Sequence, residues 1–157
     1  MNFEDCFDAL IGAEGGYVNP KPEDDPGGET KFGISKRSYP HEDIPGMTLD
    51  RAKAIYLADF WNVVGCDLLP DTARFDVFDV AVNSGPHEAR LLLQQAAKTP
   101  ADGVIGPNTL AAIAAMNADV LRRRISGARL LFMTDCKNWL PNSRGWAVRI
   151  AHNLLRD

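Results

Sequence analysis

The segment TARFDVFDVAVNSG, from Thr72 to Gly85, decides the fold because it is apolar nearly all round. A helix with apolar residues on every side is normally buried among other elements. The sequence therefore predicts a central buried helix, which ends where Gly85 and Pro86 interrupt the pattern. The other segments are expected to pack around it.

Helical patterns lie on both sides of this segment. Before it, Thr48 can cap a helix over LDRAKAIYLADFW. After it, Pro86 and Pro107 can each serve as the first residue of a helix. A long helix is expected over residues 118–137, followed by a break at LPNSRG (140–145) and a last helix. The expected apolar positions are Leu49, Ala52, Ile55, Tyr56 and Phe60, then Leu121, Ile125, Ala128, Leu131 and Phe132, and finally Trp146, Ala147, Ile150 and Leu154.

The first residues also predict an amphipathic helix. Apolar side chains recur at i, i+3, i+4, i+7 and i+8 from Phe3 to Ile11, and the next position on that stripe is Glu14. Gly15 and Gly16 then end the helix. A loop rich in proline and glycine follows, with room for short strands at 16–18 and 31–34. The expected fold class is mainly α, with a small β-hairpin near the N-terminus.

The totals describe an ordinary globular chain. It has 157 residues, 45% of them hydrophobic and 24% charged, which fits one domain or a domain with a docked subdomain. A formal charge of -4 gives no basic field to attract nucleic acid. Three scattered cysteines and three scattered histidines lack the spacing of a metal site, so we expect no metal and no cofactor.

The sequence shows no stretch with the pattern of a targeting signal. The first residues are acidic where a signal peptide is basic, and no stretch has the length of a transmembrane span. We therefore expect synthesis in the cytoplasm and no stable membrane association.

The acidic residues near the N-terminus are candidates for acid–base chemistry. A carboxyl among apolar neighbours has a raised pKa, so Glu14 could donate a proton near neutral pH, or it could turn out into water. Asp24 or Asp25 could supply the second carboxylate that glycoside hydrolysis needs, or they could belong to a solvated turn. Thr30 could help to orient a water, or it could be structural.

These residues carry a resemblance to a known family. EGGY, DPGGET and FGI, in that order, resemble the signature of glycoside hydrolase family 108, the phage-type N-acetylmuramidases. The resemblance implies a lysozyme-like fold, with Glu14 as general acid and Asp25 and Thr30 completing the catalytic set. AVNSG and DGVIGPNT are similar to the predicted peptidoglycan-binding region of such proteins. The expected division is therefore a catalytic region at 1–83 and a binding region at 84–157, packed as one unit.

One departure from the family pattern concerns the second carboxylate. The loop before DPGG is longer than usual, through KPED, so Asp24 and Asp25 both remain candidates, and the adjacent Pro-Gly-Gly favours Asp25. Inversion needs a carboxyl separation of roughly 6.5–9.5 Å and retention about 5–5.5 Å. The sequence leaves both mechanisms open.

Other residues have two interpretations each. Tyr17 could line the sugar cleft or fill the core. Asn83 and Ser84 could contact substrate or simply end the buried helix. The arginines of the long helix could meet the acidic wall polymer or form a solvated face, and the tryptophans are expected in the core. These are Arg122, Arg123, Arg124 and Arg129, and Trp61, Trp139 and Trp146.

The resemblance implies an endolysin, a monomer that hydrolyses the bond between N-acetylmuramic acid and N-acetylglucosamine in bacterial peptidoglycan and lyses the host. Such an enzyme would remain in the host cytoplasm until a holin releases it to the wall. A prophage remnant or the cargo of a secretion system would also lack a signal peptide. The alternatives are a lytic transglycosylase, which needs no water-holding aspartate, and a wall-binding protein without activity.

Overall fold

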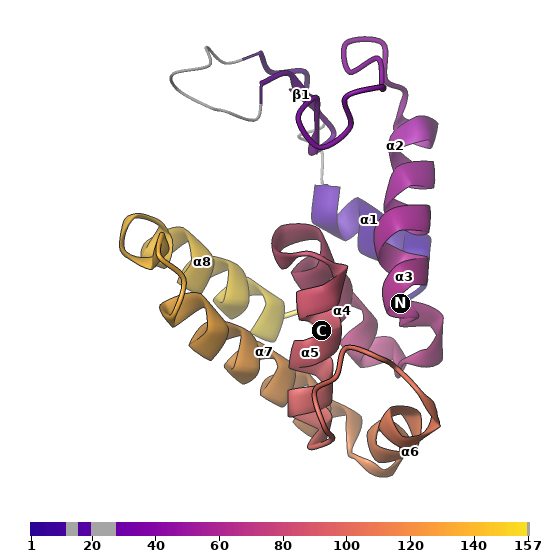
Figure 1. Ribbon diagram of the computed structural model, residues 1–157, viewed down its shortest axis with the longest axis vertical. Helices are drawn as coiled ribbons and strands as arrows, with labels where there is room; N and C mark the ends of the chain where they lie inside the picture. Colours follow the sequence, from indigo (N-terminus) through magenta and orange to yellow (C-terminus); the bar gives the residue numbers. More distant parts are fainter. Residues whose placement is uncertain (12–15, 20–27, 157) are drawn as a thin grey trace.

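The computed structural model describes residues 1–11, 16–19 and 28–156, and they form a mainly helical fold with one small hairpin (Figure 1). This confirms the expected lysozyme-like, mainly α class. Glu14, Asp24 and Asp25 lie outside the described residues. The elements are α1 (Phe3–Ile11), β1 (Thr30–Lys31), β2 (Ile34–Ser35), α2 (Leu49–Tyr56), the π-helix η1 (Leu57–Trp61), α3 (Asn62–Val64), the 3-10 helix η2 (Cys66–Leu68), α4 (Asp71–Ser84), α5 (Pro86–Ala97), α6 (Pro107–Ala115), α7 (Ala118–Thr134) and α8 (Trp139–Leu154).

Helix α4 is the buried centre that the sequence predicts. It packs against α1, α5 and α7, and α8 packs on α7. The hairpin lies at one end of the molecule and α6 at the other, while α7 and α8 lie on the flank opposite α2 (Figure 1). Helices on both sides of residue 84 thus pack together, and the division at that residue stays a prediction.

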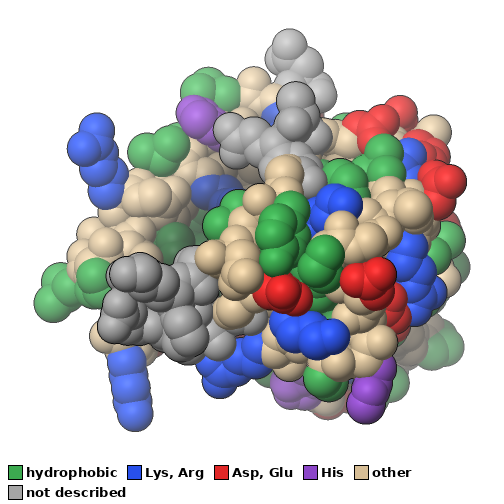
Figure 2. All heavy atoms as spheres, turned by 90° about the horizontal axis from the view of Figure 1, so that it is seen from above, with side chains coloured by type: hydrophobic (Ala, Val, Ile, Leu, Met, Phe, Trp, Pro, Cys, Tyr) green, Lys and Arg blue, Asp and Glu red, His purple; other side chains and the backbone are tan. Residues whose placement is uncertain are grey.

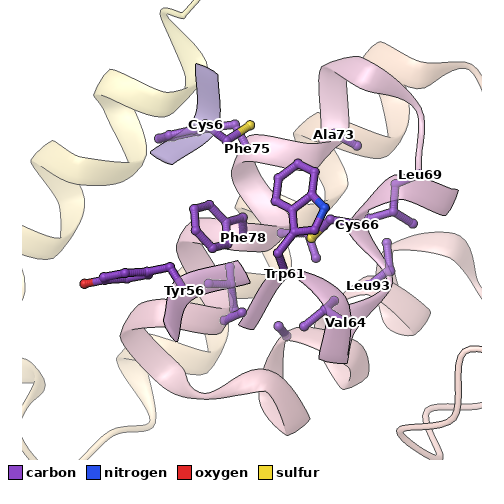
Figure 3. Close-up of a cluster of buried hydrophobic side chains, with 14 of the residues drawn as sticks. Cys6, Tyr56, Trp61, Val64, Cys66, Leu69, Ala73, Phe75, Phe78 and Leu93 are labelled. Carbon is purple, nitrogen blue, oxygen red and sulfur yellow. The ribbon is translucent and has the colours of Figure 1, made fainter. Parts of the chain in front are cut away.

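An aromatic cluster fills the space between α1, α2 and α4. The Trp61 and Phe78 rings meet edge to face with their centroids 5.5 Å apart. Phe3 adds a second edge contact to Trp61, and Tyr56 a contact to Phe78. Figure 3 shows Trp61 and Phe78 at the centre, with the Tyr56 hydroxyl directed away from them. Edge contacts of this kind stabilise a core beyond its buried area.

The π-helix explains how Trp61 reaches this core. Ala52, Ile55 and Tyr56 are buried at helical spacing, and the next fully buried residue is Trp61, five positions after Tyr56. A π turn accommodates that step because it adds one residue to the turn. The expected stripe through Phe60 is displaced by one position, and Phe60 is only half-buried. Thr48 caps α2 as predicted, accepting a hydrogen bond from the Arg51 amide.

The hairpin differs from its prediction. The expected strand at 31–34 is instead divided by a tight turn, with Phe32 at φ 50 and Gly33 at φ 76 between Lys31 of β1 and Ile34 of β2. Two successive positive φ values are typical of a two-residue hairpin turn. The 16–18 segment contributes a single bridge, from Val18 to Thr30.

Two expectations for the C-terminal helices are wrong. No break occurs at 140–145, because Pro141 lies in the first turn of α8, where its missing N–H has no intrahelical acceptor. Leu131 is 70% exposed, since the buried face of α7 runs through Leu121, Ile125, Arg129 and Met133.

The remaining assignments of helix faces also need correction. Leu49, Ala147 and Leu154 are exposed, whereas Ile150 is buried as predicted. Trp61 is a core residue, but Trp139 and Trp146 are half-buried, with ring centroids 6.1 Å apart. Among the described helices, none has the length and apolar character to cross a membrane.

Gly33→Ala tests the turn. The substitution strains a backbone at positive φ, which costs about 1–2 kcal/mol, and its Cβ would collide with the Tyr56 hydroxyl. In a Tyr56→Phe background the collision is removed, so we expect a smaller loss there. Urea unfolding of the four proteins measures both terms, and equal losses in the two backgrounds would contradict the close approach.

Candidate active site

The hairpin holds Thr30 at the edge of a loop. The Thr30 amide and carbonyl both pair with Val18 at 2.8 Å, and β1 also pairs with β2. The Thr30 hydroxyl donates to the Gly28 carbonyl at 3.2 Å. Because its proton is engaged, the hydroxyl oxygen can accept a hydrogen bond from another group. Gly28 is the last residue of the DPGG motif, so this bond ties Thr30 to the end of the segment that contains Asp25.

Tyr17 lies on the surface of the same lobe. Its side chain is 43% exposed, and its hydroxyl donates to the Glu29 carboxylate at 3.1 Å. The interpretation as core filler is therefore wrong. The exposed ring leaves the sugar-binding prediction open.

A hollow of about 340 Å³ lies where the hairpin turn, the end of α1 and the end of α4 meet. Ile11 is the last residue of α1, three positions before Glu14 in the sequence. We call this space the hairpin hollow. Its lining includes Ile11, Phe32, Gly33, Tyr56, Asn83 and Arg149.

Tyr56 fixes the hairpin turn against the helical core. Its hydroxyl donates to the Phe32 carbonyl at 3.0 Å. Burial raises the pKa of Tyr56 to about 12, so the hydroxyl keeps its proton at any physiological pH. This hydrogen bond therefore holds one wall of the hairpin hollow in place independently of pH.

Asn83 and Ser84 are at the opposite wall, at the C-terminal end of α4. The Asn83 amide donates to the Asp79 carbonyl at 2.7 Å and to the Asp79 carboxylate at 2.8 Å. Helix termination falls to Gly85, at φ 92, and to Pro86. Asn83 lines the hairpin hollow, and both Asn83 and Ser84 line a neighbouring hollow between α7 and α8. Their role as substrate contacts stays a prediction.

Asp79 is the residue beneath this wall that the sequence interpretation missed. It is 1% exposed, and four N–H donors surround its carboxylate. Its Oδ1 accepts from Asn83 and Arg149, each at 2.8 Å, and its Oδ2 accepts from Arg129 at 2.5 Å and from Asn153 at 2.8 Å. The available signal was a pair of aspartates, Asp76 and Asp79, in a segment otherwise apolar nearly all round, since a buried charge needs a partner.

The charges around Asp79 outweigh the effect of its burial. Burial raises the pKa of the Asp79 carboxyl, but Arg129, Arg149 and the Asn153 amide together bring that pKa below its ordinary value. Asp76, one turn earlier on α4, behaves in the opposite way. Burial raises its pKa to about 6 despite the nearby Arg122, which donates from Nε at 3.1 Å.

The arginines of α7 therefore do not form the surface patch that either earlier interpretation assumed. Arg129 is 2% exposed and pairs with Asp79, Arg122 pairs with Asp76, and Arg124 donates to the Ala96 carbonyl. Arg123 alone of the four is exposed. Within the described part of the chain, no group of three or more His, Cys, Asp or Glu is placed to hold a metal ion.

The family model described as Glycosyl hydrolase 108 matches residues 7–85, from the core of α1 to the end of α4. The chain belongs to this family. A structure of SagA from Brucella abortus is similar over 98% of this chain and 92% of that one, with 31% identity and a TM-score of 0.86. No curated protein matches the chain.

Family membership makes the chain a glycoside hydrolase, and peptidoglycan is the substrate that the family implies. The matched segment contains Glu14, Asp25, Thr30, Tyr17, Asn83 and Ser84. It also includes the described residues of the hairpin hollow except Arg149. That arginine comes from α8, outside the matched segment.

Asp79→Asn is expected to cost about 3–5 kcal/mol of folding stability, because it leaves the buried Arg129 guanidinium without its charge partner. The lowered pKa means that the carboxylate stays charged at pH 7 and above its unfolded pKa of about 3.9, and that its contribution is lost only as pH falls through the lower folded value.

Asp76→Asn is the matched control on the same helix. The Asp76 pKa is raised, so the native state binds its proton more tightly, and its charged form reduces stability as pH rises from about 4 to about 6. Its loss should therefore cost less than that of Asp79. Denaturant unfolding at pH 7 compares the two, and a larger loss for Asp76→Asn would contradict this assignment.

Proposed function

We propose that the protein is an N-acetylmuramidase that hydrolyses the β-1,4 bond between N-acetylmuramic acid and N-acetylglucosamine. The observation that carries the proposal is the hairpin hollow, where the end of α1, the hairpin turn and the end of α4 meet. In the sequence, the EGGY motif follows α1 and the DPGGET motif leads into the hairpin. A cleft of this kind between a hairpin and helices, with two carboxylates in adjoining segments, suits glycoside cleavage.

In this mechanism Glu14 protonates the glycosidic oxygen as the sugar bond breaks. Asp25 and Thr30 position a water on the other face of the ring, and the water attacks the anomeric carbon and gives up its proton to the carboxylate. The described geometry supports the part of Thr30, because its hydroxyl donates to Gly28 and its oxygen remains able to accept from that water.

The same observation favours hydrolysis over the transglycosylase alternative. A lytic transglycosylase closes the muramic acid onto itself and needs no water-holding group. Here Thr30 is held between Val18, Gly28 and Ser35 at the end of the DPGGET motif. A protein that only binds the wall would need neither this hydroxyl nor the acids of the EGGY and DPGGET motifs.

The biological setting belongs to the proposal as well. We propose an endolysin that works as a monomer, accumulates in the bacterial cytoplasm and depends on a holin to reach the wall. The region at 84–157 would add peptidoglycan binding to the catalytic region at 1–83. Support for this setting is the resemblance of the motifs to phage-type enzymes.

Glu14→Gln should reduce cleavage of purified peptidoglycan by about 10²–10⁴-fold, because it removes the general acid and preserves the shape of the side chain. Mass spectrometry of the soluble fragments is the measurement. Fragments with a reducing N-acetylmuramic acid end from the wild type would support the muramidase. Anhydro ends would make it a transglycosylase, and no fragments at all would leave a wall-binding protein.

Asp25→Asn should lower the rate strongly and Asp24→Asn only weakly. The two variants are matched controls for each other, since each removes one charge from the same loop. The reverse order would assign the water-holding role to Asp24. Thermal unfolding of each variant separates a loss of chemistry from a loss of fold.

Thr30→Val should lower kcat and leave the melting temperature nearly unchanged, because valine has the same shape but no hydroxyl. Thr30→Ser keeps the hydroxyl and should retain most of the activity. Equal activity of the valine and serine variants would remove Thr30 from the mechanism.

A further inference from the structure

A second hollow, of about 220 Å³, lies between α7, α8 and the end of α4. We call it the α7–α8 hollow. Its lining includes Asn83, Ser84, Arg129, Asn138, Trp146 and Arg149. Asn83 and Arg149 also line the hairpin hollow, so the two spaces adjoin at these side chains. Asn83 and Arg149 can therefore contact a ligand in either space.

The junction carries an unbalanced positive charge. Asp79 supplies one negative charge against the guanidinium groups of Arg129 and Arg149. Each Asp79 oxygen already accepts two N–H donors, so the carboxylate has no room for further donors. One of the two arginine charges therefore has no counterion among the described residues around Asp79.

Both arginines also have N–H groups that donate no hydrogen bond within the described residues. Within the described residues, Arg149 donates only through Nη1, to Asp79, and its side chain is 45% exposed. The buried Nε and Nη2 of Arg129 have no hydrogen-bond partner there. Unpaired buried donors are costly, so an acceptor that entered this hollow would remove a penalty. A carboxylate supplies both the missing acceptor and the missing charge.

The charge of the chain segment around the hollow also favours an anion there. From Cys136 to Arg156 the sequence contains no Asp or Glu, and α8 itself carries Arg144, Arg149 and His152. In the view from the hairpin end, Lys and Arg appear on both sides of the face, whereas the visible Asp and Glu lie away from the α8 side (Figure 2). The field of this segment opposes the formal charge of -4 that the whole chain carries.

We propose that the α7–α8 hollow is a substrate subsite that binds a carboxylate carried by the muramic acid substituent, with Arg149 as the contacting residue. Arg129 shares Asp79 with Arg149 and lines the same hollow, where its unpaired Nε and Nη2 would donate to the same carboxylate. Trp146 also lines this hollow, and an aromatic ring there suits the sugar ring that bears the substituent. The inference rests on the proposed function, since it names which part of peptidoglycan the adjoining hollow recognises.

Two parts of peptidoglycan present this carboxylate. The lactyl group of muramic acid has a free carboxylate when the peptide stem is missing, and the stem carries its own carboxylates when it is attached. The chemistry that Arg149 recognises is the same, so the substrates in the test must separate the two.

The test removes the charge from the substrate and from the enzyme, separately and together. Cleavage of intact peptidoglycan and of peptide-free glycan strands is measured before and after the carboxylates of each are amidated. For the wild type we expect amidation to reduce kcat/KM about tenfold in at least one of the two substrates. Arg149→Gln should lower kcat/KM on the untreated substrate by a similar factor and be insensitive to amidation.

The substrate that shows this sensitivity identifies the source of the carboxylate. Sensitivity in intact peptidoglycan alone assigns the peptide stem, and sensitivity in peptide-free strands assigns the lactyl group. If Arg149→Gln and amidation lowered kcat/KM independently of each other, or if neither lowered it, the inference would be overturned. The muramidase proposal would remain in place.

Two further variants separate charge recognition from structure. Arg149→Lys keeps a cation at the site and should retain part of the sensitivity to amidation. Arg144→Gln removes the same charge from an exposed position of α8 and should behave as the wild type. If Arg144→Gln also abolished the sensitivity, a diffuse field and not a subsite would be responsible.

A binding measurement covers the case in which the wild type cleaves nothing. The readout is quenching of tryptophan fluorescence, since Trp146, one of the three tryptophans, lines the hollow. The ligands are N-acetylmuramic acid and a disaccharide–tetrapeptide muropeptide, each beside its amidated form. We expect the charged form of one ligand to bind about tenfold more tightly, and this difference to vanish in Arg149→Gln. Equal binding of charged and amidated forms overturns the subsite, whatever becomes of the catalytic proposal.

Discussion

The buried carboxylate of Asp79 connects the helices that form one side of the candidate active site. It lies on α4 and accepts hydrogen bonds from Arg129 of α7 and from Arg149 and Asn153 of α8. Asn83, at the end of α4, completes the set. Because the carboxylate is enclosed by four donors with fixed directions, α7 and α8 can dock on α4 only in a register that satisfies all of them. The place of Arg149 at the junction of the two hollows follows from that register.

A smaller constraint orders the opposite wall. The hairpin is too short to be stable alone, with two residues in each strand. It is held because the hydroxyl of the buried Tyr56 reaches out of the aromatic cluster to the Phe32 carbonyl, over a turn where Gly33 leaves room. The hairpin turn is thus fixed to the aromatic core. Thr30 lies two residues before the turn. One wall of the hairpin hollow therefore depends on the Tyr56 hydrogen bond and the other on the donors around Asp79.

The sequence was sufficient for the parts that depend on local pattern. The buried segment at 72–85, the Thr48 cap and the helices that start at Pro86 and Pro107 were all predicted, because burial and capping leave marks within a few residues. The turn at Phe32 and Gly33 was missed because a non-glycine residue at positive φ looks like an ordinary strand position. The burial of Arg129 was missed for another reason. Its partner, Asp79, is 50 residues away in sequence, and only the tertiary structure brings them together. Of the site, the motifs could be predicted, whereas the charged network behind them could not.

The energetics of that network bear on why it is present. Taking charged groups out of water costs several kcal/mol per ion, and apolar residues of similar volume often replace a buried ion pair without loss of stability. The joining of three helices therefore does not by itself explain the Asp79–Arg129 pair, because apolar residues could join them as well. The arrangement has one property that an apolar junction would lack: it holds a second, half-exposed guanidinium at a fixed point beside the cleft. An arginine fixed by a carboxylate that is already saturated keeps its remaining donors for another acceptor, and does so without losing further side-chain entropy when that acceptor arrives. The buried pair thus makes sense as the support of Arg149, and through Arg149 the packing of the C-terminal helices becomes part of substrate recognition.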